Sequence, residues 1–179
     1  MNVQRIRVPV GFLYGLVFLY FCRPVPYLLG AGLLLAAAGL AFRIWSTGHL
    51  KKWRRLAVQG PYRFTRNPLY FGSFLLGLGF TLASARLFLL ILFLFLFVLL
   101  YRPVMRREEK ELGDEYGEDY LVYRDRVSLF LPGRALAVSG HEQESRFSWS
   151  RVWENREYKA VLGYFIVSLF LCLKLQWSI

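Results

Sequence analysis

Residues 87–101 read LFLLILFLFLFVLLY and contain no charged side chain. Four more stretches of this kind are spread along the chain. A helix that crosses a hydrocarbon core of about 30 Å needs about 20 residues, so the shorter stretches must use flanking Arg, Lys and Tyr side chains that reach the headgroups. We therefore predict an all-α fold, a polytopic transmembrane helical bundle with about five spans, near residues 8–22, 24–42, 68–85, 87–103 and 160–177.

Composition and charge predict a multi-pass integral membrane protein. Of the 179 residues, 56% are hydrophobic and 18% aromatic, and the net charge is +11. The basic residues flank apolar stretches, which is typical of topology signals, so no nucleic-acid partner is predicted. When the five predicted spans are placed across a membrane, all of the 23 Lys and Arg residues except Arg23, Arg86 and Lys174 fall on one side of it. The positive-inside rule predicts that this side, with the N-terminus, is cytoplasmic.

The spans also contain signals for helix packing. Gly11 and Gly15 are four residues apart, as are Ser73 and Gly77. Because this spacing of small residues lets helix backbones approach closely in lipid, we expect both pairs to lie at helix contacts. Residues 83–86 leave a very short connector, which predicts an antiparallel hairpin of the third and fourth spans.

The polar segment at residues 59–72, which includes GPYRFTRNPLYFG, leads into the third span. Pro68 suits a first helical turn, and Asn67 is placed to cap that turn. Such a helix start directs free N–H groups towards the cytosol, where Arg63 and Arg66 add positive charge, so it favours binding of a carboxylate or phosphate. The alternative is that the arginines only anchor the helix to headgroups. The aromatic residues interleaved with them favour a shaped pocket instead.

A second polar segment, residues 105–132, follows the fourth span. Glu108 and Glu109 fall close to the membrane surface on a helix that continues from the bilayer. Glu111 and Glu115 are expected to be solvated partners of neighbouring basic residues. The two histidines and the two cysteines show no metal-ligand spacing, so we predict no metal site.

The two segments resemble motifs of the isoprenylcysteine carboxyl methyltransferases and related phospholipid methyltransferases, which are small integral membrane enzymes. The first resembles the family's GPY-x-x-x-RHP-x-Y-x-G, and the second resembles EE-x-x-L, FG-x-x-Y-x-x-Y and VP-x-x-LP, with the spacing within each intact. Asn67 replaces the family's histidine, so a role that needs imidazole protonation cannot operate here. Tyr116 stands in place of phenylalanine and Ser128 in place of proline.

The resemblance implies an S-adenosylmethionine site at the cytoplasmic end of the third and fourth spans, with a lateral opening for a lipid-like substrate. Residues 1–132 would form the methyltransferase core, 133–159 a cytoplasmic polar connector and 160–177 an additional C-terminal transmembrane helix. Taken by position in the motifs and by side-chain type, the cofactor-binding residues would be Tyr62, Asn67, Pro68, Tyr70, Glu108, Glu109, Tyr120, Tyr123 and Leu131.

The side chains of these segments suit the parts of S-adenosylmethionine. Arg66 suits the α-carboxylate, and Glu108 or Glu109 suits the ammonium or the ribose diol through charge-assisted hydrogen bonds. Tyrosine rings suit the adenine face or the sulfonium. We assign catalytic roles to Arg66 and Glu108, the latter as general base if the acceptor is an amine. Arg63 and Arg66 would bind the substrate.

The sequence therefore predicts an S-adenosylmethionine-dependent methyltransferase that acts among membrane lipids on a lipophilic small-molecule or prenylated substrate, such as an isoprenylcysteine-like carboxylate. The membrane would be the cytoplasmic membrane in a prokaryote and the endoplasmic reticulum in a eukaryote. Three alternatives stay open: a phospholipid or amine N-methyltransferase, an NADPH-dependent membrane reductase of the sterol type, and a membrane module without catalytic activity.

Overall fold

The computed structural model describes residues 3–50, 56–134 and 146–177. Within these ranges the chain is helical and forms no strand, which confirms the all-α prediction. Apolar helices are present at all five predicted span positions. The elements are α1 (Val3–Phe21), α2 (Pro26–His49), the 3₁₀ helix η1 (Gly60–Arg63), α3 (Pro68–Ala83), α4 (Leu87–Arg126), α5 (Trp149–Glu154) and α6 (Tyr158–Trp177).

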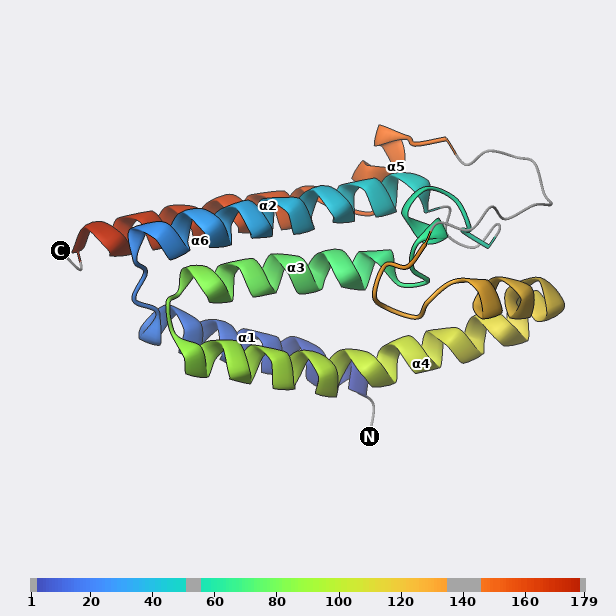
Figure 1. Ribbon diagram of the computed structural model, residues 1–179, viewed down its shortest axis with the longest axis horizontal. Helices are drawn as coiled ribbons and strands as arrows, with labels where there is room; N and C mark the ends of the chain where they lie inside the picture. The colour runs from blue at the N-terminus through green and yellow to red at the C-terminus, as the bar shows by residue number, and fades with distance from the viewer. Residues whose placement is uncertain (1–2, 51–55, 135–145, 178–179) are drawn as a thin grey trace.

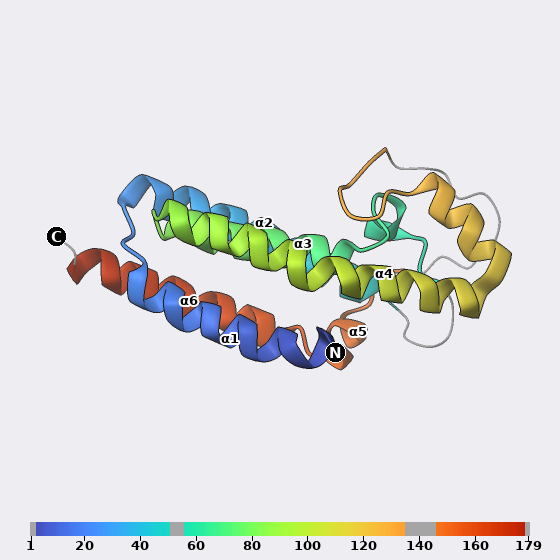
Figure 2. The same cartoon turned by 90° about the horizontal axis from the view of Figure 1, so that it is seen from below.

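The long helices pack in two layers (Figure 1, Figure 2). Helices α2, α3 and α4 lie side by side in one layer, and α1 and α6 form the other. By length and composition, α2, α4 and α6 are each able to cross a membrane, whereas the apolar segments Val8–Phe21 and Pro68–Ala83 are shorter. The predicted hairpin is present, because α3 ends at Ala83 and α4 begins at Leu87.

The two ends of the bundle differ in charge. At the polar end, α2 finishes, α3 begins, and η1 and α5 lie beside them (Figure 1). At the opposite end, the Arg23 N–H donates to the Ser84 carbonyl at 3.0 Å, and Lys174 Nζ donates to the Leu19 carbonyl at 2.7 Å. Arg86 lies at this same end, at the N-cap position just before α4. The three basic residues that the sequence separates from the others therefore lie together, away from the polar end.

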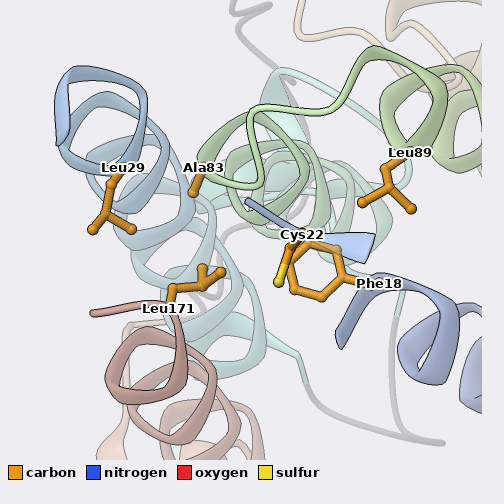
Figure 3. Close-up of a cluster of buried hydrophobic side chains, with 6 residues drawn as sticks. All are labelled: Phe18, Cys22, Leu29, Ala83, Leu89 and Leu171. Atoms are coloured by element: carbon orange, nitrogen blue, oxygen red, sulfur yellow. The ribbon is translucent and has the colours of Figure 1, made fainter. Parts of the chain in front are cut away.

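A hydrophobic cluster closes the opposite end of the bundle (Figure 3). It draws side chains from both layers, so it ties the ends of the long helices together through apolar contacts. Such contacts depend on close packing rather than on direction. Its buried members are Phe18, Cys22, Leu29, Ala83, Leu89 and Leu171.

Helices α2 and α3 meet along a glycine seam, formed by Gly32 and Gly39 on α2 with Gly72 and Gly79 on α3. A Cβ added to Gly32 would lie 2.5 Å from the Gly79 oxygen, and one added to Gly39 would lie 2.7 Å from the Gly72 oxygen. Each helix carries its two glycines seven residues apart, so the antiparallel helices pair them twice. Any side chain at these positions would push the backbones apart.

The expectation that Gly11 and Gly15 lie at a helix contact is wrong. Among the described residues, no atom apart from the backbone of α1 itself lies within 4 Å of a Cβ added to either glycine. Of the second expected pair, Gly77 makes room for the ring of Phe93 on α4, while Ser73 Oγ accepts a hydrogen bond from Arg43. The four-residue spacing therefore missed the backbone contact, which follows a seven-residue period on α2 and α3.

The other side of α3 faces α4 through an aromatic seam, formed by Tyr70 and Phe74 on α3 with Phe93, Phe97 and Tyr101 on α4. The Phe74 ring centroid lies 5.0 Å from that of Phe97 and 5.9 Å from that of Phe93. Rings of this size keep the α3 and α4 backbones farther apart than the glycines keep α2 and α3. The same helix is thus packed by backbone on one side and by side chains on the other.

Helix α2 runs past residue 42, where its charge-free stretch stops, because Arg43 is paired inside the protein. Its Nη2 and Nε donate to the two oxygens of Glu157 at 2.8 and 3.1 Å, and its Nη1 donates to Ser73 Oγ. Glu157 is only 4% exposed. This ion pair joins α2 and α3 to the start of α6.

Helix α5 lies within residues 133–159, where the sequence predicts a polar connector, and it covers the end of α2. The Ser148 N–H donates to the Gly48 carbonyl at 3.0 Å. The Phe147 ring packs on Gly48, where a Cβ would lie 2.1 Å from a ring atom. A short helix of six residues leaves little periodicity to detect in a sequence.

Candidate functional site

Three segments converge at the polar end of the bundle. The first runs from η1 into α3, the second is the part of α4 near Glu108, and the third is the chain that follows Gly117. At Gly117, φ is 55° and ψ is −127°, and α4 turns back towards η1 (Figure 1). Glycine adopts this conformation readily because it has no Cβ. The reversal brings the last part of α4 back to the first segment.

An ion pair joins the first two segments. Arg66 Nη1 donates to Glu109 Oε1, and Arg106 Nη1 donates to Glu109 Oε2 at 2.9 Å. The Arg66 and Glu109 side chains are only 11% and 13% exposed, so their charges are weakly screened by water. Within the described part of the chain, Arg66 Nε is a buried donor that has no hydrogen-bond partner. A buried unpaired donor costs free energy, so a bound acceptor would be stabilised there.

Glu108 lies beside this pair and contacts the aromatic residues of the first segment. The Tyr70 hydroxyl donates to Glu108 Oε1. Tyr62 is buried, and burial, with a further contribution from Glu108 and Tyr70, raises the pKa of its phenol above the ordinary value. The Tyr62 phenol is therefore neutral at physiological pH.

The returning part of α4 packs two more tyrosines against the site. Tyr120, Tyr123 and Val127 form a buried cluster. The Tyr123 hydroxyl donates to the Tyr62 carbonyl at 2.7 Å, which ties the third segment to η1. Burial raises the pKa of Tyr120, while a hydrogen bond with Arg66 acts in the opposite direction. Tyr120 thus lies within reach of the Arg66 and Glu109 pair.

The chain after α4 is clasped to the first segment by backbone hydrogen bonds. The Arg66 N–H donates to the Ser128 carbonyl at 2.9 Å, and the Gly133 N–H donates to the Phe64 carbonyl at 2.9 Å. Between them, the buried Thr65 hydroxyl donates to the Phe130 carbonyl at 2.8 Å. The segment that closes the site is therefore held on both sides of Arg66.

Asn67 does not cap α3 with its side chain, which corrects the expectation from sequence. Pro68 does occupy the first turn, and Asn67 occupies the cap position without a side-chain cap hydrogen bond. Its Nδ2 donates instead to the Leu129 carbonyl at 2.9 Å. The amide therefore helps to hold the segment after α4 and does not cap the helix start, because the returning chain brings the Leu129 carbonyl within its reach.

The predicted site residues do not all lie in the cluster. Tyr62, Arg66, Tyr70, Glu108, Glu109, Tyr120 and Tyr123 are linked by the contacts described above, and Asn67 and Pro68 adjoin them. The Leu131 side chain is 66% exposed, and the Arg63 side chain is exposed on η1. Glu111 is exposed and pairs with Arg107 at 2.7 Å, as expected of a solvated partner.

Sequence reasoning missed three contributors to this site. Thr65 donates a hydrogen bond to the segment after α4, and Arg106 donates one to Glu109. The Phe130 ring packs against Phe74 on α3 and Phe97 on α4. Thr65 lies inside the first polar segment, and Arg106 lies three residues before Glu109, so both were visible as neighbours. The position of Phe130 gives no such signal, because it depends on the reversal at Gly117.

Comparison with known proteins identifies the core of this fold. A family model described as phospholipid methyltransferase matches residues 27–119, which is more than half of the chain and runs from α2 to the turn of α4. No curated protein matches the chain, and no solved structure matches it.

Proposed function

The chain belongs to the phospholipid methyltransferase family, and we propose that it transfers a methyl group from S-adenosylmethionine to a lipophilic acceptor at the cytoplasmic face of a membrane. Family membership implies a membrane methyltransferase. The donor, the acceptor class and the membrane face are the parts that we propose.

The observation that carries the proposal is the ion pair between Arg66 and Glu109. These residues belong to two polar segments that are separated along the chain by α3 and the first part of α4, yet they form one cluster with Glu108 and Tyr70. Structural anchoring of the helices to headgroups would need only exposed cations. A nearly buried arginine, two carboxylates and four tyrosines gathered in one place are better explained by ligand binding.

The chemistry of the cluster fits S-adenosylmethionine. The Nε–H of Arg66, which has no partner among the described residues, suits the α-carboxylate. Glu108 suits the ammonium or the ribose diol. Tyr62, Tyr70 and Tyr120 offer aromatic faces for adenine or for a cationic sulfur. When bound, S-adenosylmethionine supplies a methyl group activated by the sulfonium.

The chain's own residues would contribute alignment and proton handling. Alignment of reacting groups contributes about 7 to 11 kcal/mol in well-oriented systems, and the clasped segment after α4 holds such a site in place. Both oxygens of Glu109 accept hydrogen bonds from arginines, so we assign the general-base role to Glu108. With an amine acceptor, a Glu108 carboxylate oxygen would take the proton. With a carboxylate or thiolate acceptor, Arg63 or Arg66 would hold the anion.

The charge distribution supports the proposed membrane face. All Lys and Arg residues except Arg23, Arg86 and Lys174 lie on the side of the threaded chain that holds the site. Because positive residues favour cytoplasmic loops, we propose that the polar end faces the cytosol.

Binding measurements test the donor. Purified protein in detergent is titrated with S-adenosylmethionine, S-adenosylhomocysteine and NADPH by calorimetry. We expect the first two to bind and NADPH not to bind. Binding of NADPH alone would replace the proposal with a reductase.

A set of glutamate variants tests the site. We expect Glu108→Ala and Glu109→Ala to weaken S-adenosylmethionine binding by about tenfold or more, since a hydrogen bond to a charged group contributes about 1.5–3 kcal/mol. Glu111→Ala, on an exposed position of the same helix, is the matched control and should leave the affinity unchanged. Equal affinities for all three variants would remove the carboxylate assignment. Incubation of membranes with methyl-labelled S-adenosylmethionine then identifies the acceptor.

A further inference from the structure

A row of aromatic rings leads from the proposed site along the aromatic seam. Tyr70, whose hydroxyl donates to Glu108, places its ring 5.4 Å from the Tyr101 ring. The Tyr101 ring stacks on Phe97 at 4.4 Å with an interplanar angle of 13°. Phe97 in turn lies 5.8 Å from Phe93. The row therefore connects a carboxylate at the polar end with the apolar middle of α4.

Phe130 adds a ring to this row from outside the helices. Its ring centroid lies 5.6 Å from Phe74, 5.7 Å from Phe97 and 5.8 Å from Phe71. The other rings of the row stand on α3 or α4, whereas Phe130 stands on the segment that follows α4. The Phe130 backbone is therefore not part of either helix that carries the rest of the row.

The backbone that carries Phe130 is fixed to the site. Thr65 donates to the Phe130 carbonyl at 2.8 Å, and Asn67 donates to the Leu129 carbonyl at 2.9 Å. Both donors adjoin Arg66 along the chain. The Phe130 backbone is thus held close to Arg66, so a displacement of the ring would have to come from rotation of its side chain.

The row can be reached from the lipid side of the bundle. Phe74, Phe93 and Phe130 are each partly exposed, while Phe97 is buried behind them. On α4, the neighbouring Phe95 and Val98 are exposed and form part of the apolar outer surface. An apolar chain that lies against this outer surface of α4 would therefore be close to the row.

We propose that the hydrocarbon chain of the lipophilic acceptor lies along this row in the place of the Phe130 ring, and that Phe130 determines which chains are accepted. The inference rests on the proposed function, because only that function makes the bound molecule the methyl acceptor. The polar head of that molecule would lie at Glu108, and its chain would replace ring contacts with equivalent apolar contacts. A larger side chain at position 130 should reduce the range of hydrocarbon chains that are accepted, and a smaller one should extend that range.

Photo-crosslinking tests the placement without requiring methyl transfer. The full chain is reconstituted in phosphatidylcholine nanodiscs that contain a small share of phosphatidylethanolamine with a diazirine at the end of one acyl chain. After irradiation, labelled peptides are mapped by mass spectrometry. Labelling of residues 70–77 and 93–101 is expressed relative to Phe165 and Ile166, which lie exposed on α6 and report surrounding lipid.

We expect Phe130→Ala to raise this relative labelling several-fold and Phe130→Trp to lower it. Phe95→Ala, which removes a ring from the outer surface of α4, is the matched control and should leave the ratio unchanged. If Phe130→Ala does not give a monodisperse protein, Phe130→Leu takes its place. Equal ratios for the small and large residues at position 130, or a row that is never labelled above the α6 reference, would overturn the inference.

A second readout separates this inference from the proposed function. Methyl transfer to acceptors of increasing chain length is measured for the wild type and for both Phe130 variants. A shift of the preferred length with the size of residue 130 supports the inference. Transfer with one unchanged length profile overturns it and leaves the methyltransferase intact. If no acceptor is methylated, the proposed function fails, and the labelling ratios alone decide where a lipid chain lies.

Discussion

The two sides of α3 are packed in opposite ways. Towards α2, the glycine seam brings backbone against backbone, so that a Cβ at Gly79 would lie 2.4 Å from the Ala36 nitrogen. Towards α4, the aromatic seam fills the space with rings, and even Gly77 serves to accommodate the Phe93 ring. A backbone contact has no side-chain torsion that could relieve a clash, whereas rings can change rotamer. The α2–α3 pair is thus the fixed part of the bundle, and the α3–α4 side is the adaptable part.

Under the proposed function, the difference between the two sides of α3 bears on how the site would hold a ligand. Arg66 lies just before α3, one helix of the fixed pair, while Glu108 and Glu109 stand on α4, on the adaptable side. A ligand held between them would contact the fixed side of α3 on one face and the adaptable side on the other. The following predictions test this difference, beginning with the largest effect.

Substitution within the glycine seam should break the fold. Gly39→Leu places a side chain where a Cβ already lies 2.4 Å from the Leu76 nitrogen, so we expect loss of folded, monodisperse protein. Gly30→Leu is the control on the same helix, because within the described ranges no atom outside the backbone of α2 lies within 4 Å of a Cβ there. Expression and size-exclusion chromatography in detergent measure the outcome. Equal yields of both variants would mean that the seam is not a close contact.

Two alanine substitutions on α3 compare the seams directly. Gly79→Ala should lower the free energy of unfolding by about 2–3 kcal/mol, because the added methyl group meets the α2 backbone. Gly77→Ala should lower it by about 1 kcal/mol or less, because the Phe93 ring can turn away. Thermal unfolding of both variants in the same detergent gives the order. A larger effect at Gly77 would reverse the assignment of fixed and adaptable sides.

Removal of a ring from the aromatic seam should have a moderate effect. Phe97→Ala opens space beside Phe74 and Phe93, yet these rings and the acyl chains of lipid can fill it. We therefore expect a loss of about 1–2 kcal/mol, below the 3–5 kcal/mol that is typical of closed cores. Val98→Ala, at an exposed position of the same helix, is the control. A loss typical of a closed core would show that the aromatic side is as fixed as the glycine side.

High pH should lower the free energy of unfolding through the buried phenol of Tyr123. Burial raises the pKa of Tyr123 above its ordinary value of 10.0, so the folded state retains a proton that the unfolded chain releases. This contribution to stability is fully present below pH 10 and is lost as the pH rises further, by at most about 1.4 kcal/mol per pH unit. Denaturant unfolding at pH 8 and pH 11 measures the loss, which should be smaller for Tyr123→Phe. An identical loss in the variant would assign the effect to other groups.

Much of the fold could be predicted from the sequence because burial in lipid imposes long apolar stretches. Residues 87–101 indicated a membrane helix, and the short connector at residues 83–86 indicated the hairpin that the structure contains. The limits of α2 were predicted less well, because Arg43 is a charge that pairs with Glu157 inside the bundle. A charge-free criterion detects apolar residues and cannot anticipate a distant partner.

The sequence predicted which residues gather at the candidate site, but it did not predict which of them form hydrogen bonds and ion pairs with one another. Two polar segments at the ends of one hairpin must come close together, so Arg66 could be expected near Glu108 and Glu109. Their pairing is more specific, with Arg66 on Glu109 and Tyr70 on Glu108. Asn67 was assigned to a helix cap from local sequence, but the returning chain offers the Leu129 carbonyl instead. Local patterns cannot include a partner that stands more than 60 residues away.

The sequence by itself determined that this chain forms apolar helices with their basic residues gathered towards one end, because hydropathy and charge act on each segment separately. The tertiary structure alone decided that α2 and α3 meet through four glycines, that α4 reverses at Gly117, and that Phe130 enters the aromatic seam. These features depend on which surfaces meet in space. Their physical basis is close packing between segments, which only the folded chain brings together.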